Sequence, residues 1–168
     1  MDTKIFSDAG VVPSFVTEKC EDYIKGSYKG ASIELTEALL VTFRRRHDIR
    51  SPIVFRGYLF RLSMEQKFSG HTMVRNRKNF LNRFYSWHYK SWFPNKISEL
   101  ETVRFEDSGF HRKFEVRSSD NDEARHLLTA TFIKRLIDLD HCFGKKAISC
   151  AFYENDLLIS VKSKSNKF

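Results

Sequence analysis

The sequence predicts an α+β protein: an antiparallel sheet of about six to eight strands, one long helix in the C-terminal half packed on it, and a closing β-hairpin. Three observations lead to this class. Segments with alternating apolar residues outnumber helical segments, the connections between them are short, and one helical pattern stands out at residues 121–141. Strands joined by short connections pair antiparallel, and a helix with one apolar side buries that side against the sheet.

The first half of the chain opens with residues 4–15, which predict irregular structure or a short helix. Four strand predictions follow. Lys29 and Gly30 form a turn signal between the first two, and a charged loop precedes Pro52. The four predicted strands are residues 22–29, 31–43, 53–62 and 71–75.

The second half predicts two further strands, residues 102–106 and 113–118, then a helix and a hairpin. The hairpin is the run AISCAFY, the turn Glu154-Asn155-Asp156 and the run LLISVK. The helical stripe consists of residues three or four apart: Ala124, Leu128, Phe132, Leu136 and Leu139. This spacing is typical of an amphipathic helix that is half buried.

Length and composition fit one domain spanning residues 1–168, because apolar and charged fractions are ordinary and no linker divides the chain. No run approaches the ~18–20 apolar residues that a membrane-spanning helix needs. The odd set Cys20, Cys142 and Cys150 indicates unpaired thiols in a reducing, cytoplasmic compartment. No Cys/His spacing resembles a metal site, so we expect no metal and no other cofactor.

The net charge of +8 is concentrated in residues 41–96, which hold thirteen basic and two acidic side chains. Such asymmetry indicates an anionic partner, unless the excess is only a solvated face. Seven aromatic residues fall within residues 80–93 and basic residues alternate with them. The candidate residues for an anionic surface are Arg75, Arg77, Lys78, Arg83, Trp87, Lys90 and Trp92.

Three interpretations of this aromatic, basic segment remain open. The rings can cover one end of the sheet as additional core. Rings with Arg and Lys also suit single-stranded nucleic acid, although no recognised RNA-binding signature is present. Trp, Tyr and Lys together suit a lipid headgroup interface. Binding to nucleic acid should weaken steeply with salt, whereas interfacial binding through buried rings should not.

Two opposite charges lie on otherwise apolar strand faces. Glu37 alternates with Leu35 and Leu39, and Arg56 alternates with Val54 and Tyr58. If both faces point into the core, the two charges need partners, and pairing with each other is the simplest solution. If the face is only partly covered, both reach water. A catalytic role for Glu37 is the remaining reading.

The stretch FEVRSSDNDEARHLLTATFIKRL runs from a strand into a helix through a charged junction. Ser119 or Asp120 can cap the first amides of the helix, and Asp122 and Glu123 then complement its dipole. A structural role is therefore sufficient for these charges. The alternative is a catalytic cluster of Asp120, Glu123 and Arg125, which requires a cleft and a perturbed pKa. No nucleophile motif or phosphate-binding loop supports an enzyme, so we lean towards a non-catalytic protein.

Residues 110–136, FHRKFEVRSSDNDEARHLLTATFIKRL, resemble the signature of the bacterial family known as domain of unknown function 3137. Motifs at residues 21–26, 36–40, 55–57 and 68–72 resemble it in order. The matching residues in the longest segment are Phe114, Val116, Ser118, Asp120, Glu123, Ala124, Arg125, Leu127, Leu128, Thr129, Phe132, Arg135 and Leu136. Two positions depart from the family pattern. His126 replaces an aromatic Tyr, and Ala130 replaces a Pro that would restart a helix, so residues 121–141 form one helix or two.

The resemblance implies no established activity. Many members of the family place this domain after hydrophobic segments, on the cytoplasmic side, so the chain is expected to be either the soluble part of a longer protein or a free-standing member. We therefore expect a non-catalytic binding or scaffolding domain, associated with the cytoplasmic face of the inner membrane or with a protein partner. A nucleic-acid-binding module that uses residues 75–93 is the alternative, and an enzyme of unknown class comes third.

Overall fold

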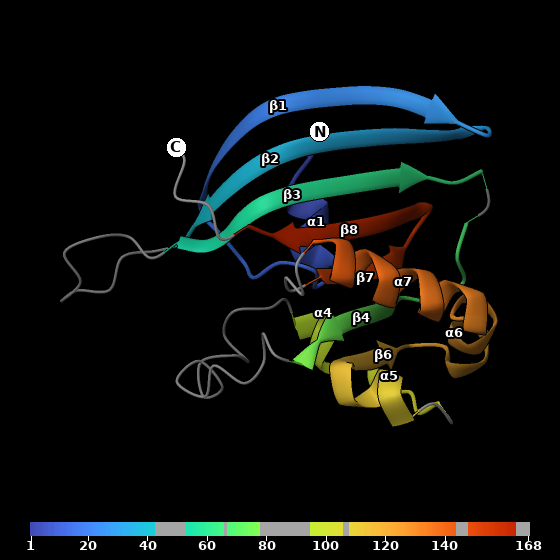
Figure 1. Ribbon diagram of the computed structural model, residues 1–168. Helices are drawn as coiled ribbons and strands as arrows, with labels where there is room; N and C mark the ends of the chain where they lie inside the picture. Colours follow the sequence, from blue (N-terminus) through green and yellow to red (C-terminus); the bar gives the residue numbers. More distant parts are fainter. Residues whose placement is uncertain (43–52, 66, 78–94, 106–107, 144–147, 164–168) are drawn as a thin grey trace, which may run out of the picture.

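An eight-stranded antiparallel sheet runs through the protein (Figure 1). The computed structural model describes residues 1–42, 53–65, 67–77, 95–105, 108–143 and 148–163. The spatial order of the strands is β1-β2-β3-β8-β7-β4-β6-β5, so the C-terminal hairpin lies in the centre of the sheet. The strands are β1 (Thr17–Tyr28), β2 (Ala31–Val41), β3 (Ile53–Ser63), β4 (Thr72–Asn76), β5 (Glu101–Thr102), β6 (Phe114–Ser118), β7 (Ile148–Tyr153) and β8 (Asp156–Lys162).

The predicted hairpins form because their turn residues adopt left-handed backbone conformations. Lys29 and Gly30 have φ values of 51° and 85°, which suits a two-residue turn between β1 and β2. Glu154, in the turn between β7 and β8, has a φ of 56°. The antiparallel sheet, the strand number and the closing hairpin are confirmed. β1 begins at Thr17, earlier than predicted, and β5 is only two residues long.

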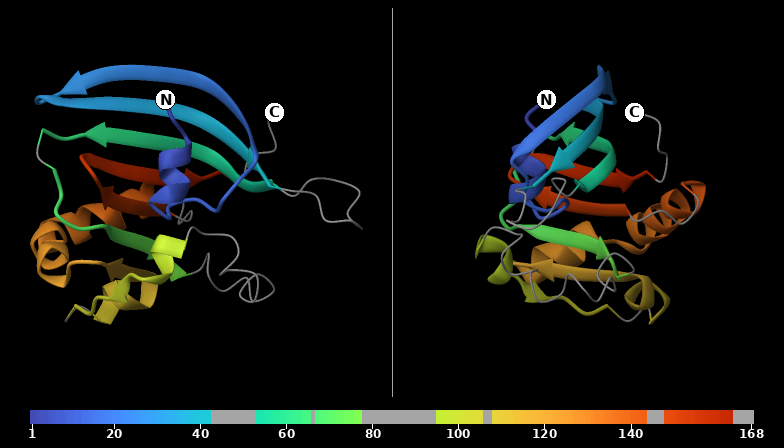
Figure 2. Two further views of the ribbon diagram at one scale, coloured as in Figure 1. Left: turned by 180° about the vertical axis from the view of Figure 1, so that it is seen from behind. Right: turned by 90° about the vertical axis from the view of Figure 1, so that its left-hand side faces the viewer.

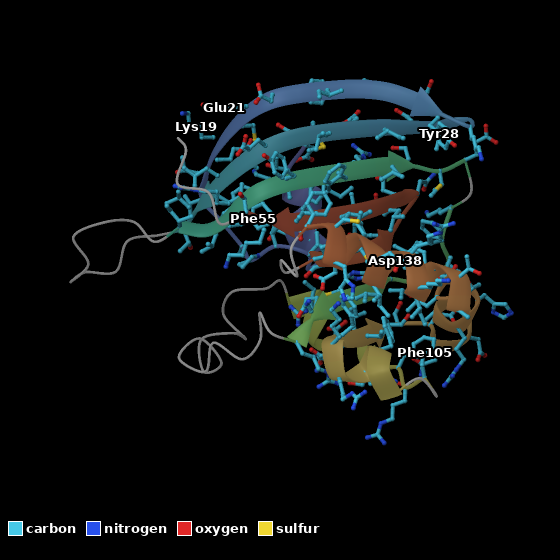
Figure 3. All side chains as sticks on the ribbon, in the orientation of Figure 1. Lys19, Glu21, Tyr28, Phe55, Phe105 and Asp138 are labelled. Carbon is cyan, nitrogen blue, oxygen red and sulfur yellow. The ribbon has the colours of Figure 1, made fainter. Side chains whose placement is uncertain are left out.

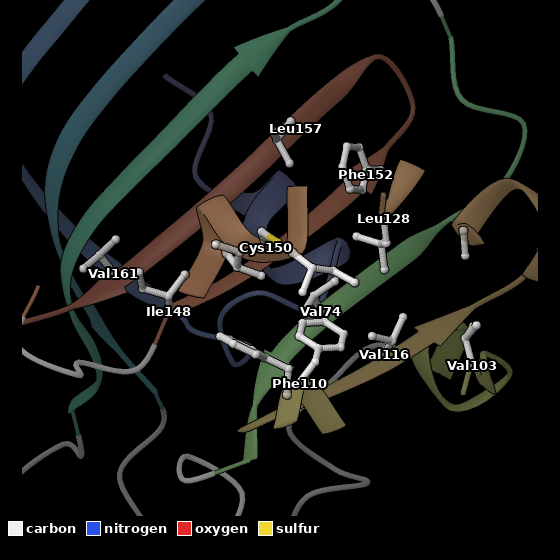
Figure 4. Packing of buried hydrophobic residues seen from close by; sticks show 14 residues of the cluster. Val74, Val103, Phe110, Val116, Leu128, Ile148, Cys150, Phe152, Leu157 and Val161 are labelled. Atoms are coloured by element: carbon white, nitrogen blue, oxygen red, sulfur yellow. The ribbon is translucent and has the colours of Figure 1, made fainter. Parts of the chain in front are cut away.

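Alternation along the strands gives the sheet two faces, each with its own apolar core. One core packs against the helices of the C-terminal half and includes Val74, Val116, Cys150 and Phe152 (Figure 4). The other packs against the N-terminal segment and includes Phe6, Leu40 and Leu59. Figure 2 shows helices on both sides of the sheet. We call these the α7 face and the α1 face, after the helix on each.

Five helices flank the sheet in the described part of the chain. They are α1 (Lys4–Asp8), α4 (Asn95–Ser98), α5 (Ser108–Lys113), α6 (Asn121–Leu127) and α7 (Ala130–Cys142). Residues 4–15 were predicted as irregular structure or a short helix, and α1 agrees with the second alternative. Within the described residues, the structure shows no helix long and apolar enough to span a bilayer.

The prediction of one long helix at residues 121–141 is wrong, because α6 ends at Leu127 and α7 begins at Ala130. Leu128 leaves the helical region, with φ −89° and ψ 58°, and its side chain is buried in the core. Thr129 is extended, and its Oγ1 accepts a hydrogen bond from the N–H of Phe132 at 3.2 Å. A threonine cap and a buried leucine therefore maintain the break without proline.

Gly57 explains one motif of the family resemblance. It lies in β3 with a φ of 154°, where β8 approaches closely. A Cβ at this position would overlap the carbonyl oxygen of Val161. Only glycine fits here, so the Phe-Arg-Gly motif at residues 55–57 has a structural cause.

Candidate functional site

The charged junction between β6 and α6 is a capped helix start. Oδ1 of Asp120 accepts hydrogen bonds from the N–H groups of Asp122 at 3.1 Å and Glu123 at 2.9 Å. The bond from the Glu123 amide, with those from Ser69 and Asp122 and the nearby His126, lowers the pKa of Asp120 against the opposing effect of desolvation. Asp120 therefore stays ionised and acts as the N-cap of α6, as its sequence position predicts.

Glu123 holds a loop from another part of the chain. Its Oε1 accepts from the N–H of Ser69 and its Oε2 accepts from the N–H of Gly70, both at 2.7 Å. The two chain segments are further joined by the backbone N–H of Ser119 and its side-chain Oγ, which bond the backbone of His71. We call this arrangement, formed by residues 69–71 and 119–123, the loop clamp.

The loop clamp brings together two motifs of the family resemblance that lie far apart in sequence. Phe-x-Gly-x-Thr at residues 68–72 supplies the amides, and residues 118–125 supply the acceptors. A Cβ on Gly70 would lie 2.7 Å from the Cβ of Asp120, so a larger residue would force the segments apart. These motifs therefore have structural reasons to contain glycine and carboxylates.

The predicted catalytic cluster of Asp120, Glu123 and Arg125 does not converge on a common point. Both carboxylates accept hydrogen bonds from backbone amides within the loop clamp. Arg125 instead lies over the ring of Phe105, with its guanidinium carbon 5.8 Å from the ring centroid. The three residues have separate tasks, and Arg125 alone takes part in an open groove.

This groove lies where α6 gives way to α7 and has a volume of about 570 Å³. We call it the α7 groove. Its wall is mostly apolar, and two cationic side chains, Arg125 and Lys134, complete it. The lining residues are Phe105, Arg125, Leu128, Thr129, Ala130, Ile133, Lys134 and Ile137.

The break between the helices creates the α7 groove and fixes its chemistry. Phe105 forms part of the wall and packs edge-on against Phe110, with ring centroids 6.0 Å apart (Phe105 is labelled in Figure 3). The first turn of α7 lies at the groove, so the positive end of the helix dipole adds to the charges of Arg125 and Lys134. An apolar wall beside positive charge suits a ligand with an anionic head and an apolar body.

Sequence reasoning missed this groove as a site. It identified Arg125 as a structural or catalytic candidate, but not Lys134 or Phe105. These residues come from separate segments, and the folded chain brings them together at the break between α6 and α7. The local signal was the threonine at residue 129, which can restart a helix without the following proline.

Glu37 and Arg56 lie on the α7 face in neighbouring strands. Glu37 is opposite Tyr58 and Arg56 is opposite Leu39, so the two charges are diagonal neighbours. Both residues are partly exposed, because α7 covers the face over β7 and β8 rather than over β2. This agrees with a partly covered face, and the Glu37–Arg56 ion pair stays a prediction.

Most of the predicted anionic-surface residues lie outside the described part of the chain: Lys78, Arg83, Trp87, Lys90 and Trp92. Arg75 is buried on the α1 face, and desolvation lowers its pKa to about 10 despite the favourable charge of Glu115. Arg77 is exposed, and its Nε donates to the carbonyl of Phe114 at 3.2 Å. The binding role of residues 75–93 therefore stays a prediction.

A further charge that sequence reasoning missed is Asp140, on the buried side of α7 with Ile133 and Leu136. Its carboxylate lies 2.7 Å from the Nζ of Lys113 at the end of α5. The spacing of residues 133, 136 and 140 could have shown that an acidic residue shares the buried stripe. Among the described residues, no group of three or more His, Cys, Asp or Glu side chains is arranged to bind a metal ion.

Comparisons with known proteins place the chain in a family. No curated protein matches it. Among solved structures it is similar to the mycobacterial trehalose monomycolate transport factor A, TtfA, with 12% identity and a TM-score of 0.49. The match covers 88% of this chain and 62% of TtfA, so the chain spans less than two thirds of that structure. A model of the family described as "Protein of unknown function (DUF3137)" matches residues 53–168, which include the loop clamp and the α7 groove. The chain belongs to this family.

Proposed function

We propose that this protein is a non-catalytic binding domain whose α7 groove takes an anionic amphiphile at an anionic membrane surface, on the cytoplasmic side. The observation that carries the proposal is the pairing of an apolar wall with Arg125 and Lys134 in one open groove. A lipid headgroup with its first methylene groups has the matching chemistry, because its phosphate pairs with the cations and its chain contacts Ile133 and Ile137.

Two properties of the molecule support this proposal. The net charge of +8 favours approach to an anionic surface. Two carboxylates close to Arg125 in sequence, Asp120 and Glu123, accept hydrogen bonds from backbone amides of the loop clamp, and neither lines the groove. Scaffolding of a protein partner would use the same kind of surface without a lipid.

Binding of a short-chain lysophosphatidylglycerol, measured by calorimetry, tests the proposal against the zwitterionic lysophosphatidylcholine. We expect the double variant Arg125→Gln/Lys134→Gln to bind the anionic lipid about 10- to 100-fold more weakly, because two charge-assisted contacts are lost. The matched control is Arg112→Gln/Arg135→Gln. It removes the same charge from exposed positions, one of them next to Lys134 on α7 but outside the groove.

A second variant separates shape from charge. Ala130 is exposed and lines the groove, so Ala130→Trp fills it without removing a buried side chain. We expect this variant to bind the anionic lipid weakly. Equal binding by the groove variants and the control contradicts the proposal. If only the variant Trp87→Ala/Trp92→Ala loses lipid binding, the binding site lies in residues 75–93 instead.

The nucleic-acid alternative depends on those same residues and stays a prediction. A single-stranded RNA in a shift assay, at low and high salt, distinguishes it from lipid binding. A shift that high salt abolishes would favour nucleic acid, because phosphate contacts release counterions. Lipid binding in an apolar groove should persist at high salt.

A further inference from the structure

The outermost strand of the sheet, β1, has an open edge in the described part of the chain. It ends the strand order and pairs only with β2 there. β1 lies at the outside of the sheet (Figure 2), and all twelve of its residues are exposed. An open strand edge presents unpaired N–H and C=O groups that can pair with another strand.

The side chains of β1 are unusual for a free edge. Tyr23, Ile24 and Tyr28 are 52%, 60% and 64% exposed, and Ile24 and Tyr28 lie on the same face of the sheet, opposite Leu35 and Ala31 of β2. β1 carries charges and a bulge, as protected edges often do, but it is twelve residues long and exposes these three large apolar side chains. Large exposed apolar residues on a long edge strand are typical of a surface that becomes covered.

The charges of β1 and its turn indicate what covers it. Residues 18–22 carry three acidic groups and one lysine, whereas the following segment carries Lys25 and Lys29 without an acidic group (Lys19 and Glu21 are labelled at the outer edge in Figure 3). Two copies of β1 side by side in the antiparallel direction place each acidic half opposite a basic half. A parallel arrangement places like charges together. The strand is therefore complementary to itself only in the antiparallel direction.

We propose that β1 pairs antiparallel with β1 of a second copy of this chain, with the two-fold axis between Tyr23 and Ile24. In this register Glu18 lies opposite Lys29 of the second copy, and Asp22 lies opposite Lys25. Tyr23 lies opposite Ile24 at the centre of the interface. The two eight-stranded sheets join into one continuous sheet across the dimer.

The bulge in β1 fits this register. The pairing with β2 shifts by one residue between Glu21 and Ile24, where Asp22 has a φ of 52°. Because of this shift, Cys20 and Ser27 lie on the same face of the sheet although one has an even and the other an odd number. The proposed register places Cys20 opposite Ser27 of the second copy, so residues that meet on either side of the bulge share a face. A register displaced by one residue would pair opposite faces.

Disulfide trapping tests the register. We would prepare the full chain as Ser27→Cys/Cys142→Ser, which leaves Cys20 exposed and Cys150 buried. Cys20 and the thiol introduced at residue 27 of the same chain lie ~23 Å apart along one strand and cannot bond to each other, whereas opposite residues on paired strands are within disulfide reach. We expect mild oxidation to give a covalent dimer with twice the 19.8 kDa chain mass. The control Thr17→Cys/Cys142→Ser has an added thiol on the same strand, but opposite Gly30, and should not cross-link.

Charge reversal tests the complementarity. Lys25→Glu places like charges opposite each other twice per dimer and also breaks the 3.6 Å contact of Lys25 with Glu34 of its own chain, so we expect the dimer dissociation constant to rise about tenfold or more at low salt. Lys67→Glu, at an exposed position outside the strands, controls for the change of net charge and should leave dimerisation unchanged. Light scattering after gel filtration measures both. The proposal is overturned if the protein keeps the mass of a single chain up to about 100 μM. It is also overturned if the two cysteine variants cross-link equally, or if the two charge variants have the same dimer dissociation constant.

Discussion

The ammonium nitrogen of Lys113 lies 2.7 Å from Oδ2 of Asp140, and this contact joins the end of α5 to the buried side of α7. The carboxylate is fully buried, and within the described residues neither of its oxygens has a partner with good hydrogen-bond geometry. The attraction is therefore mainly between charges. Because Asp140 also lies in the last turn of a helix, the helix dipole opposes its charge, and Lys113 compensates for an otherwise costly buried group.

Removing Lys113 should therefore destabilise the protein more than removing both partners. We expect Lys113→Met to lower the free energy of unfolding by about 3–5 kcal/mol, because it leaves an unpaired buried charge. The double variant Lys113→Met/Asp140→Leu should recover much of this loss. Urea unfolding measures each variant, with Arg112→Ala as an exposed neighbour that should change stability by less than about 0.5 kcal/mol. Asp140→Leu is also measured alone. If the stability losses of Lys113→Met and Asp140→Leu add up to that of the double variant, the two residues do not form a stabilising ion pair.

The loop clamp should contribute measurably to stability through Glu123. Glu123→Ala removes the acceptor for two backbone amides, and we expect a loss of about 1–3 kcal/mol in the free energy of unfolding. Glu123→Gln keeps one acceptor oxygen and should lose less. Asp122→Ala is the control, since this exposed carboxylate in the same turn accepts no hydrogen bond from the loop. Hydrogen exchange of the Ser69 and Gly70 amides should accelerate in Glu123→Ala and stay slow in the control.

Stability should fall in mildly acidic solution because of His71. Burial lowers the pKa of His71, and the hydrogen bond between its Nε2 and the carbonyl oxygen of Ala9, 3.0 Å away, only partly offsets this effect. Since the pKa is lower in the folded chain than in the unfolded one, the contribution is complete above about pH 6.5 and is lost as the pH falls through the folded value. We expect His71→Gln to remove this part of the pH dependence between pH 7.5 and 5. If urea unfolding shows the same change of unfolding free energy with pH in His71→Gln as in the unaltered protein, groups other than His71 cause the pH dependence.

The three thiols should differ in reactivity. Burial raises the pKa of Cys150 to about 12, so this thiol should stay unmodified in the folded protein. Cys20 is exposed, but partial burial and the nearby Glu18 raise its pKa and should slow its reaction. Mass spectrometry after iodoacetamide treatment at pH 8 should show Cys142 modified first, Cys20 next and Cys150 only after unfolding. Rapid modification of Cys150 would contradict the packing of β7.

The sequence predicted the strands well where their residues alternate strictly. The β7–β8 hairpin is an example, because Ile148, Cys150 and Phe152 face one core and Glu154 permits the turn. The prediction was poorer at β1, whose exposed residues show no alternation of burial. A strand held mainly by pairing with β2 leaves little hydrophobic signal in its own sequence.

The cap at Asp120 was also predictable, since a capping carboxylate acts within its own helix turn. The partners of Glu123 were not, because the amides of residues 69 and 70 lie about fifty residues away in sequence. The break after Leu127 could be decided only by the burial of Leu128 in the core. From local preference we predicted one long helix, although two helices stayed possible.

By itself the sequence determined the antiparallel sheet, its hairpins, the amphipathic helical segment and the excess of positive charge, because these depend on the pattern of neighbouring residues. Only the tertiary structure decided that Asp120 and Glu123 serve a clamp, that Arg125 faces a groove with Lys134, and that β1 is an exposed edge. These features depend on residues far apart in the chain, and the packing of helices on the sheet determines which of them meet.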